Sequence, residues 1–147
     1  MRLTTTLLLL IAFLMMSAAF AEETDNQKSA GKKEYKSLES ALKSGKPVFC
    51  LFHTSKACKC TMRRCGEVLV LSDSIANSFG EDIVYYKVDI AVDDDIVRNY
   101  KIIAAPTAIF FDKKGAEYAR LQSWEITPEI ISTKTAELLP KKKGSSK

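Results

Sequence analysis

Residues 46–65 have the sequence KPVFCLFHTSKACKCTMRRC, in which an apolar run is followed by closely spaced cysteines. The run Val48–Phe52 is continuous and rich in strand formers, which is typical of a central strand covered on both faces. Cys58, Cys60 and Cys65 then fall within eight residues of one another. This spacing predicts one local site, and not a set of disulfides that connect distant parts of the fold.

The sequence on either side of this stretch predicts helices that alternate with strands. Apolar residues recur at helical spacing from Lys33 to Leu42, and Gly45 and Pro47 end that helix. The elements expected after the cysteines are a helix over 65–79, a strand over 83–90, a short helix over 96–100, strands over 107–111 and 116–121, and a helix over 127–139. This order predicts an α/β fold with a mixed sheet of about four strands and helices on both faces.

Local signals define three of these elements more closely. The turn Asp112–Gly115 is a hairpin signal, so the strands that flank it must be antiparallel. Asp93–Asp95 suit the start of a helix, where carboxylates cap free amides; metal binding by this triplet is the alternative. Thr127 and Pro128 match the first positions of the last helix. The apolar face of that helix is expected to consist of Ile130, Ile131, Ala136, Leu138 and Leu139.

The N-terminus has the pattern of a secretory signal peptide. Arg2 is followed by the apolar run Leu7–Met16 and by the small residues of Ala19-x-Ala21. A membrane anchor is the alternative, but Leu7–Ala21 is shorter than the roughly 20 residues that a spanning helix needs. We therefore expect cleavage after Ala21, no stable membrane anchor, and a periplasmic or secreted protein.

The remaining boundaries follow from composition. Residues 22–32 are polar and are expected to be a flexible leader, residues 33–140 a single domain, and residues 141–147 a basic disordered tail. The formal net charge is +4, and the basic residues are interleaved with acids. Because no basic stripe with aromatics is present, nucleic acid is not an expected partner. We expect a monomer.

Two segments resemble the thioredoxin superfamily. Lys46–Phe52 is similar to its Lys-Pro-Val strand, and Tyr100–Phe111 is similar to the segment that contains its cis-proline. The similarity extends over roughly residues 35–139. The resemblance implies a thioredoxin-like fold in which Pro106 is cis and faces the cysteines. It also implies that Ala105 offers its backbone to an extended substrate chain.

The site itself departs from the family pattern. The family's Trp-Cys-x-x-Cys is replaced by Cys-x-Cys-x4-Cys, and Leu51 stands where typical thioredoxins have an aspartate for proton transfer. Counting from Phe52 without gaps puts Ala57 at the nucleophile position and Cys60 at the resolving position. One inserted residue would instead put Cys58 at the nucleophile position.

The residues themselves indicate reactive thiols. Cys58 and Cys60 are expected near a helix N-terminus, where free amides and the helix dipole favour thiolate. Positive charge is expected to add to this effect from Lys56, Lys59, Arg63 and Arg64. A disulfide between residues two apart closes a small ring, and strained disulfides are the more oxidising ones.

The other candidate residues have two interpretations each. Cys65 shares a helix side with apolar residues and is expected to be buried, with a third redox thiol or a metal ligand as the alternative. Cys50 is expected in the core. His53 is either a polar strand end or a metal ligand or acid–base group. Trp124 is expected to pack in the core, with a position lining the site as the alternative.

These features lead to two main functional hypotheses. The first is an exported thiol–disulfide oxidoreductase that uses Cys58 and Cys60 on protein thiols or disulfides, with an unidentified electron partner and no cofactor. The alternative is a thioredoxin-fold module that binds Cu(I) or Zn(II) through Cys58, Cys60, Cys65 and His53, since soft thiolates select those ions. A third hypothesis is a non-catalytic binding domain in which the cysteines have only a structural role.

Overall fold

The computed structural model describes residues 34–139. The chain divides into a unit of residues 1–32 and a unit of residues 33–147, and the second contains all the described residues. The predicted signal peptide, the leader and the basic tail therefore lie outside the described residues. Within residues 34–139, the helices are too short or too polar to cross a membrane.

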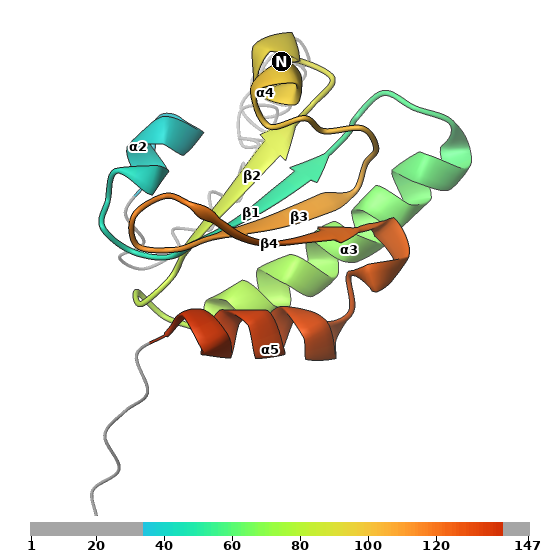
Figure 1. Ribbon diagram of the computed structural model, residues 1–147. Coiled ribbons are helices and arrows are strands. Elements are labelled where there is room, and N and C mark those ends of the chain that lie inside the picture. Colours follow the sequence, from blue (N-terminus) through green and yellow to red (C-terminus); the bar gives the residue numbers. More distant parts are fainter. Residues whose placement is uncertain (1–33, 140–147) are drawn as a thin grey trace, which may run out of the picture. The chain divides into compact units, whose positions relative to one another are not determined.

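The described residues form four strands and several helices in the order expected from the sequence (Figure 1). In chain order the elements are α2 (Leu38–Leu42), β1 (Val48–His53), α3 (Lys59–Ser78), β2 (Val84–Asp89), α4 (Asp94–Asn99), β3 (Thr107–Phe111), β4 (Glu117–Gln122), the 3-10 helix η1 (Ser123–Glu125) and α5 (Pro128–Leu138).

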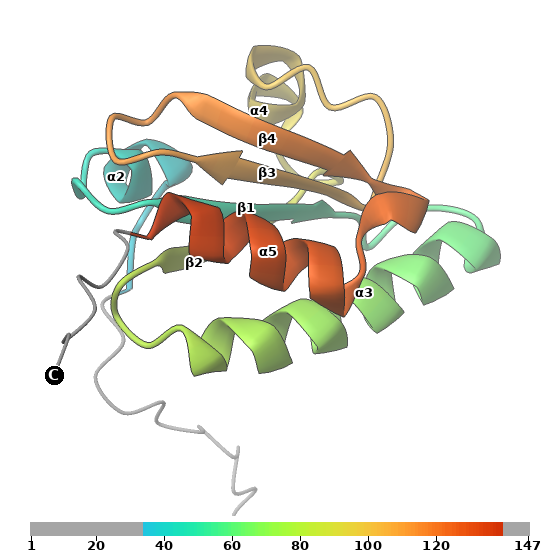
Figure 2. The same cartoon turned by 60° about the horizontal axis from the view of Figure 1, so that its bottom comes forward.

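The strands make one mixed sheet in the order β2-β1-β3-β4. β1 is parallel to β2 and antiparallel to β3, and β3 is antiparallel to β4. Helices α2 and α4 lie on one face, and α3 and α5 lie side by side on the other (Figure 2). The predicted four-stranded α/β architecture is confirmed.

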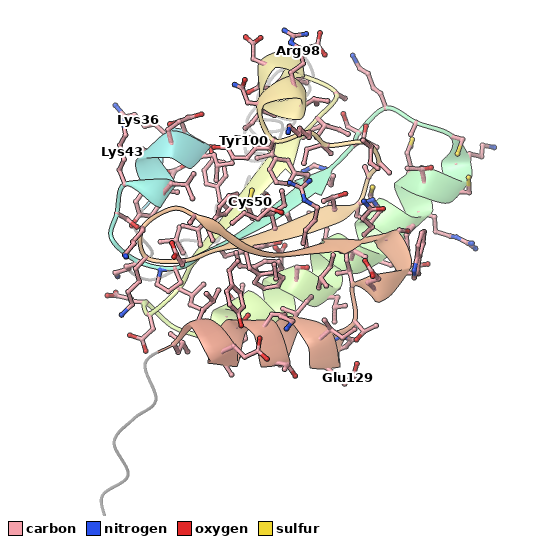
Figure 3. The ribbon with its side chains drawn as sticks, in the orientation of Figure 1. Lys36, Lys43, Cys50, Arg98, Tyr100 and Glu129 are labelled. Atoms are coloured by element: carbon pink, nitrogen blue, oxygen red, sulfur yellow. The ribbon has the colours of Figure 1, made fainter. Side chains whose placement is uncertain are left out.

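β1 occupies the centre of the sheet and is covered on both sides. Residues Val48–Phe52 are fully buried, as the continuous apolar run predicts. Alternate side chains enter different cores: Cys50 packs on the α2 and α4 side, near Tyr100, whereas Leu51 packs on the α3 and α5 side (Figure 3). Cys50 is therefore a core residue.

Several helix ends differ from the sequence-based expectation. α2 begins at Leu38, because the side chains of Ser37 and Ser40 form a reciprocal capping box. α3 begins at Lys59 instead of near Cys65, so its first turn contains the middle of the cysteine segment. These shifts leave the order of the elements unchanged.

The start of α5 is as expected, and of its expected apolar face Ile131 is buried and Ile130, Leu138 and Leu139 pack against the core, but Ala136 does not. Thr127 accepts a hydrogen bond from the backbone of Ile130, and Pro128 occupies the first turn. The buried residues of the helix are Ile131 and Thr135, whereas Ala136 is exposed. Residues four apart share a helix face, and the residue after Thr135 is turned 100° away from it. The expectation that Ala136 is a core residue was therefore wrong.

The acidic triplet Asp93–Asp95 acts as a helix start. The Oδ1 atom of Asp93 accepts a hydrogen bond of 2.9 Å from the backbone N–H of Ile96 and caps α4. Asp94 and Asp95 lie in the first turn, where their charge suits the helix dipole. The capping interpretation accounts for all three residues.

Candidate functional site

Three connecting segments leave the sheet at the same end, where β1 and β4 finish and β3 begins. Phe52 of β1 pairs with Thr107 of β3, and Thr107 pairs in turn with Gln122 of β4. The segment after β1, the segment before β3 and the segment after β4 therefore leave the sheet next to one another (Figure 1). The cysteines, Pro106 and Trp124 belong to these three segments.

The segment that leads from β1 to the cysteines is held by local hydrogen bonds. Thr54 is buried, and its Oγ1 atom bonds both the backbone N–H and the carbonyl oxygen of Lys56, at 3.2 and 3.0 Å. Asp89, at the end of β2, accepts hydrogen bonds of 3.0 Å from the backbones of Ser55 and Ala91. Hydrogen bonding, first from the Ser55 side chain, lowers the pKa of Asp89, so the carboxylate that holds this segment stays ionised.

Cys58 occupies the N-cap position of α3. Its backbone is extended, and its Sγ atom lies 3.2 Å from Oγ1 of Thr61 in the first turn. The pKa of Cys58 is lowered to about 7, first by a hydrogen bond with the side chain of Cys60 and then by those with Thr61. The lowered pKa favours the thiolate form of Cys58 near neutral pH, and the group is exposed to solvent.

The largest cause of this low pKa differs from the one expected. Hydrogen bonds lower the pKa of Cys58, the largest effect coming from the side chain of Cys60. Arg64 is engaged elsewhere, because its Nη2 atom donates to the carbonyl oxygens of Ser123 and Ile126 at 2.8 and 3.2 Å. Arg63 lies at the surface, 3.9 Å from Glu67. The expected contribution of the basic side chains stays a prediction, whereas hydrogen bonds from Cys60 and Thr61 are the causes that the structure gives.

The four cysteines are free thiols that divide into two environments. Cys58 and Cys60 are exposed. Cys65 is 2% exposed on the inner side of α3, and burial raises its pKa despite a hydrogen bond from the Thr54 backbone. Cys50 is fully buried in β1, where burial raises its pKa well above the ordinary value. Only the exposed pair combines access to solvent with a low-pKa thiol.

The residues named for a metal site do not gather into one. Over residues 34–139, no three His, Cys, Asp or Glu side chains lie close enough together to hold an ion. His53 ends β1 opposite Asp89, half-buried, and burial is the largest cause of its lowered pKa. Cys65 is buried on the inner side of α3, whereas Cys58 and Cys60 are exposed.

The segment before β3 contains the Ala105–Pro106 peptide bond, which is cis. Pro106 is buried, and its carbonyl oxygen accepts a hydrogen bond of 2.9 Å from the backbone of Ser123. Thr107 donates from its hydroxyl to the carbonyl oxygen of Ala104 at 2.7 Å. Ala105 is half-buried between Ala104 and Pro106, at the end of the sheet where β1 finishes.

Trp124 does not pack in the core. Trp124 lies in η1, between β4 and α5, and is 76% exposed. Ile126, two residues later, is 1% exposed and packs in the core instead. The packing interpretation was therefore wrong. Five further large apolar residues of the described range are exposed, and two of them, Ile103 before β3 and Met62 in the first turns of α3, lie in the segments near Cys58. Apolar residue type favours burial, so no sequence signal marked any of the three as exposed.

A hollow of about 380 Å³ lies apart from the cysteines. Its lining comes from α2, from β2 and from the α4 region, and it includes Asp89 but none of the four cysteines. Cys58 and Cys60 are exposed to solvent outside this hollow.

The comparisons with known proteins support the fold. No family model matches the chain, and no curated protein sequence is significantly similar to it. Among solved structures, it is similar to the germline-specific thioredoxin Deadhead of Drosophila melanogaster, with 19% identity, a TM-score of 0.56, and coverage of 69% of this chain and 87% of that one.

Two further thioredoxins give the same result. A mutant thioredoxin from Halobacterium salinarum has 12% identity, a TM-score of 0.60, and coverage of 74% of this chain and 88% of that one. The thioredoxin of Fasciola hepatica has 17% identity, a TM-score of 0.54, and coverage of 64% and 82%. The chain therefore has a thioredoxin-like fold.

Proposed function

We propose that the protein is an exported thiol–disulfide oxidoreductase that acts on protein thiols and disulfides through Cys58 and Cys60. The observation behind this proposal is the state of Cys58, an exposed thiol with a pKa of about 7 that is hydrogen-bonded to the second exposed thiol, Cys60. A thiolate is the attacking species in disulfide exchange, and attack is fastest when the thiol pKa is near the ambient pH. The signal-type N-terminus supports the exported location.

The reaction takes place in two exchanges. The Cys58 thiolate attacks one sulfur of a substrate disulfide, so a Cys58–substrate disulfide forms, the substrate S–S bond breaks, and the released sulfur takes up a proton. The Cys60 thiolate then attacks Sγ of Cys58, which forms a Cys58–Cys60 disulfide and releases the second substrate thiol. Two electrons pass from the protein dithiol to the substrate. The reverse sequence oxidises a substrate dithiol, and a partner dithiol or disulfide protein restores the starting state.

The positions of the two residues support this division of roles. Cys58 occupies the N-cap position of α3 with its Sγ atom 3.2 Å from Oγ1 of Thr61, and Cys60 is the second residue of the helix. Cα atoms two residues apart are within the roughly 4.4–6.8 Å that a disulfide requires. Ala57, which a gapless count aligns with the family nucleophile, has no sulfur, so the cap position favours Cys58.

The substrate chain is proposed to bind across the segment before β3. Ala105 and Pro106 lie at the sheet edge where the cysteine segment begins. The backbone of Ala104–Pro106 is held by two hydrogen bonds, one from the Thr107 hydroxyl to Ala104 and one from the Ser123 N–H to Pro106. A backbone segment held in this way is suited to pairing with an extended chain.

Catalysed disulfide reduction tests the proposal. The purified residues 22–147 are mixed with insulin and dithiothreitol, and aggregation of the released B chain is followed. We expect turnover with the wild-type protein and with Cys65→Ala, and none above the uncatalysed rate with Cys58→Ser. A wild-type rate equal to that of dithiothreitol alone would refute the proposal.

A further inference from the structure

Three large apolar side chains are exposed in the segments that meet beside Cys58. Met62, Ile103 and Trp124 are 44%, 82% and 76% exposed. One lies in the first turns of α3, one before β3 and one after β4, so all three belong to the same end of the sheet as Cys58 (Figure 1). Several exposed apolar residues in neighbouring segments can form a surface that binds another molecule.

Trp124 is held firmly although its side chain is exposed. The carbonyl oxygen of its neighbour Ser123 accepts a hydrogen bond from Arg64, and the Ser123 N–H donates to the carbonyl oxygen of Pro106. The Glu125 carboxylate accepts from the backbone of Gln122 at 2.8 Å and closes the turn. The residues around Trp124 are thus tied both to α3 and to the proline segment. A fixed aromatic side chain offers contact area with little loss of conformational entropy on binding.

Basic side chains outnumber acidic ones around this surface, where the acids beside the cysteine segment are Glu67, 3.9 Å from Arg63, and Asp89, which accepts a hydrogen bond from the Ser55 backbone. Lys56, Lys59 and Arg63 are exposed next to the cysteines, and residues 54–66 and 100–107 contain no aspartate or glutamate. The nearest acid on the third segment is Glu125, whose carboxylate is occupied by the turn of η1. Cationic side chains around an apolar centre complement an acidic and apolar polypeptide.

We propose that Trp124, with Met62 and Ile103, binds an apolar side chain next to the disulfide of an extended protein substrate, and that Lys56 and Lys59 select substrates with acidic residues beside it. This inference rests on the proposed exchange at Cys58, which it deepens by naming the substrate class. Trp124 is the residue that determines specificity, because its side chain is the largest of the three.

Paired kinetics test the inference separately from the chemistry. The probes are 2,2′-dithiodipyridine, and a short peptide whose cysteine carries the same thiopyridine leaving group and is flanked by phenylalanine and two aspartates. We expect Trp124→Ala to slow the reaction with the peptide about tenfold, or about 1.4 kcal/mol, and to leave the reaction with 2,2′-dithiodipyridine unchanged. The matched control is Val70→Ala, which removes an equally exposed apolar side chain from the middle of α3 and should alter neither rate.

Charge is tested with the same reagents. Replacing the two aspartates of the peptide by lysines should slow its reaction several-fold at low salt. Lys56→Glu should reverse that preference, whereas Lys113→Glu, in the turn at the opposite end of β3, should not. Equal rates for the two peptides would refute the acidic preference. Equal effects of Trp124→Ala on peptide and small reagent, or no effect on either, would refute the role of Trp124.

Binding can be measured without any exchange. Trp124 is the chain's one tryptophan, so intrinsic fluorescence reports on it directly. The double variant Cys58→Ser, Cys60→Ser is titrated with the aspartate peptide after methylation of its cysteine. We expect a saturable change in emission that is weaker with the lysine peptide, and an unchanged spectrum would refute the inference. If the wild-type protein did not react with 2,2′-dithiodipyridine but the double variant still bound the peptide saturably, the proposed exchange would be refuted and the proposed binding surface would not.

Discussion

The Sγ atom of Cys58 lies 3.2 Å from the Oγ1 atom of Thr61, across the first turn of α3. Hydrogen bonds lower the pKa of Cys58 to about 7, the largest effect coming from the Cys60 side chain and the next from this Thr61 hydroxyl. The hydroxyl of Thr61 and the free backbone N–H groups of the first turn all lie where they stabilise negative charge on sulfur. The reactivity of the site is therefore built into the start of the helix.

Thr61→Val keeps the shape of the side chain but removes its hydroxyl. We expect the pKa of Cys58 to rise toward its ordinary value, because one of the hydrogen bonds to the thiolate is lost. A rise of one unit would lower the alkylation rate at pH 7 by roughly fivefold. The rate of iodoacetamide modification measured against pH gives the pKa directly. Thr133→Val, on the exposed side of α5, is the control, and an identical inflection point in both variants would contradict the account.

The burial of the four cysteines predicts a labelling pattern. Reduced native protein should gain two alkyl groups quickly, on Cys58 and Cys60, because Cys50 and Cys65 are buried and burial raises the pKa of each. Unfolding in urea should then make four sites available. Intact mass with and without urea counts the groups. Labelling of Cys65 at the rate of Cys58 in the native protein would show that the helix start is not as described.

Cys65→Ala separates the redox proposal from the metal alternative. Cys65 is 2% exposed beside other core residues of α3, so its truncation should cost stability on the order of 1 kcal/mol. The rate of exchange with 2,2′-dithiodipyridine should stay within about twofold of the wild type. Urea unfolding and Cu(I) and Zn(II) titrations complete the measurement. Tight metal binding by the wild type that is lost in Cys65→Ala would favour the metal-binding module instead.

The fold could be predicted because its strongest sequence signals come from burial. The continuous apolar run Val48–Phe52 has no stable position except between two layers, and that position is the central strand. Helix phase was harder to predict. Ala136 and Thr135 are adjacent, and apolar character alone selected Ala136, whereas the phase of α5 buries Thr135.

The site was predicted only in part, for two physical reasons. Spacing showed that Cys58 and Cys60 are close, but a loop tolerates an inserted residue, so the sequence left Ala57 and Cys58 as alternative nucleophile positions. The helix start at Lys59 places Cys58 at the cap. Trp124 was assigned to the core from its residue type, yet its exposure depends on the direction in which η1 turns, which tertiary hydrogen bonds from Arg64 fix.

The N-terminal sequence predicts processing. Protein recovered from outside the cytoplasm should begin at Glu22, because Ala19 and Ala21 match the small residues before a signal-peptidase site. N-terminal sequencing or intact mass of the recovered protein measures this. An Ala19→Arg, Ala21→Arg variant should retain its N-terminus. Wild-type protein that keeps residues 1–21 would contradict both the export and the oxidising compartment in which the exchange is proposed to occur.

The most direct test of the account is to trap the intermediate of the exchange. Cys60→Ser should react with a protein disulfide and stop at the mixed disulfide, since no second thiolate can attack Sγ of Cys58. Proteolysis without reduction, followed by mass spectrometry, locates the bond. We predict a single adduct on Cys58 in Cys60→Ser and none in Cys58→Ser. An adduct on Cys65, or turnover that persists in Cys58→Ser, would contradict the assignment of Cys58 as the attacking thiol.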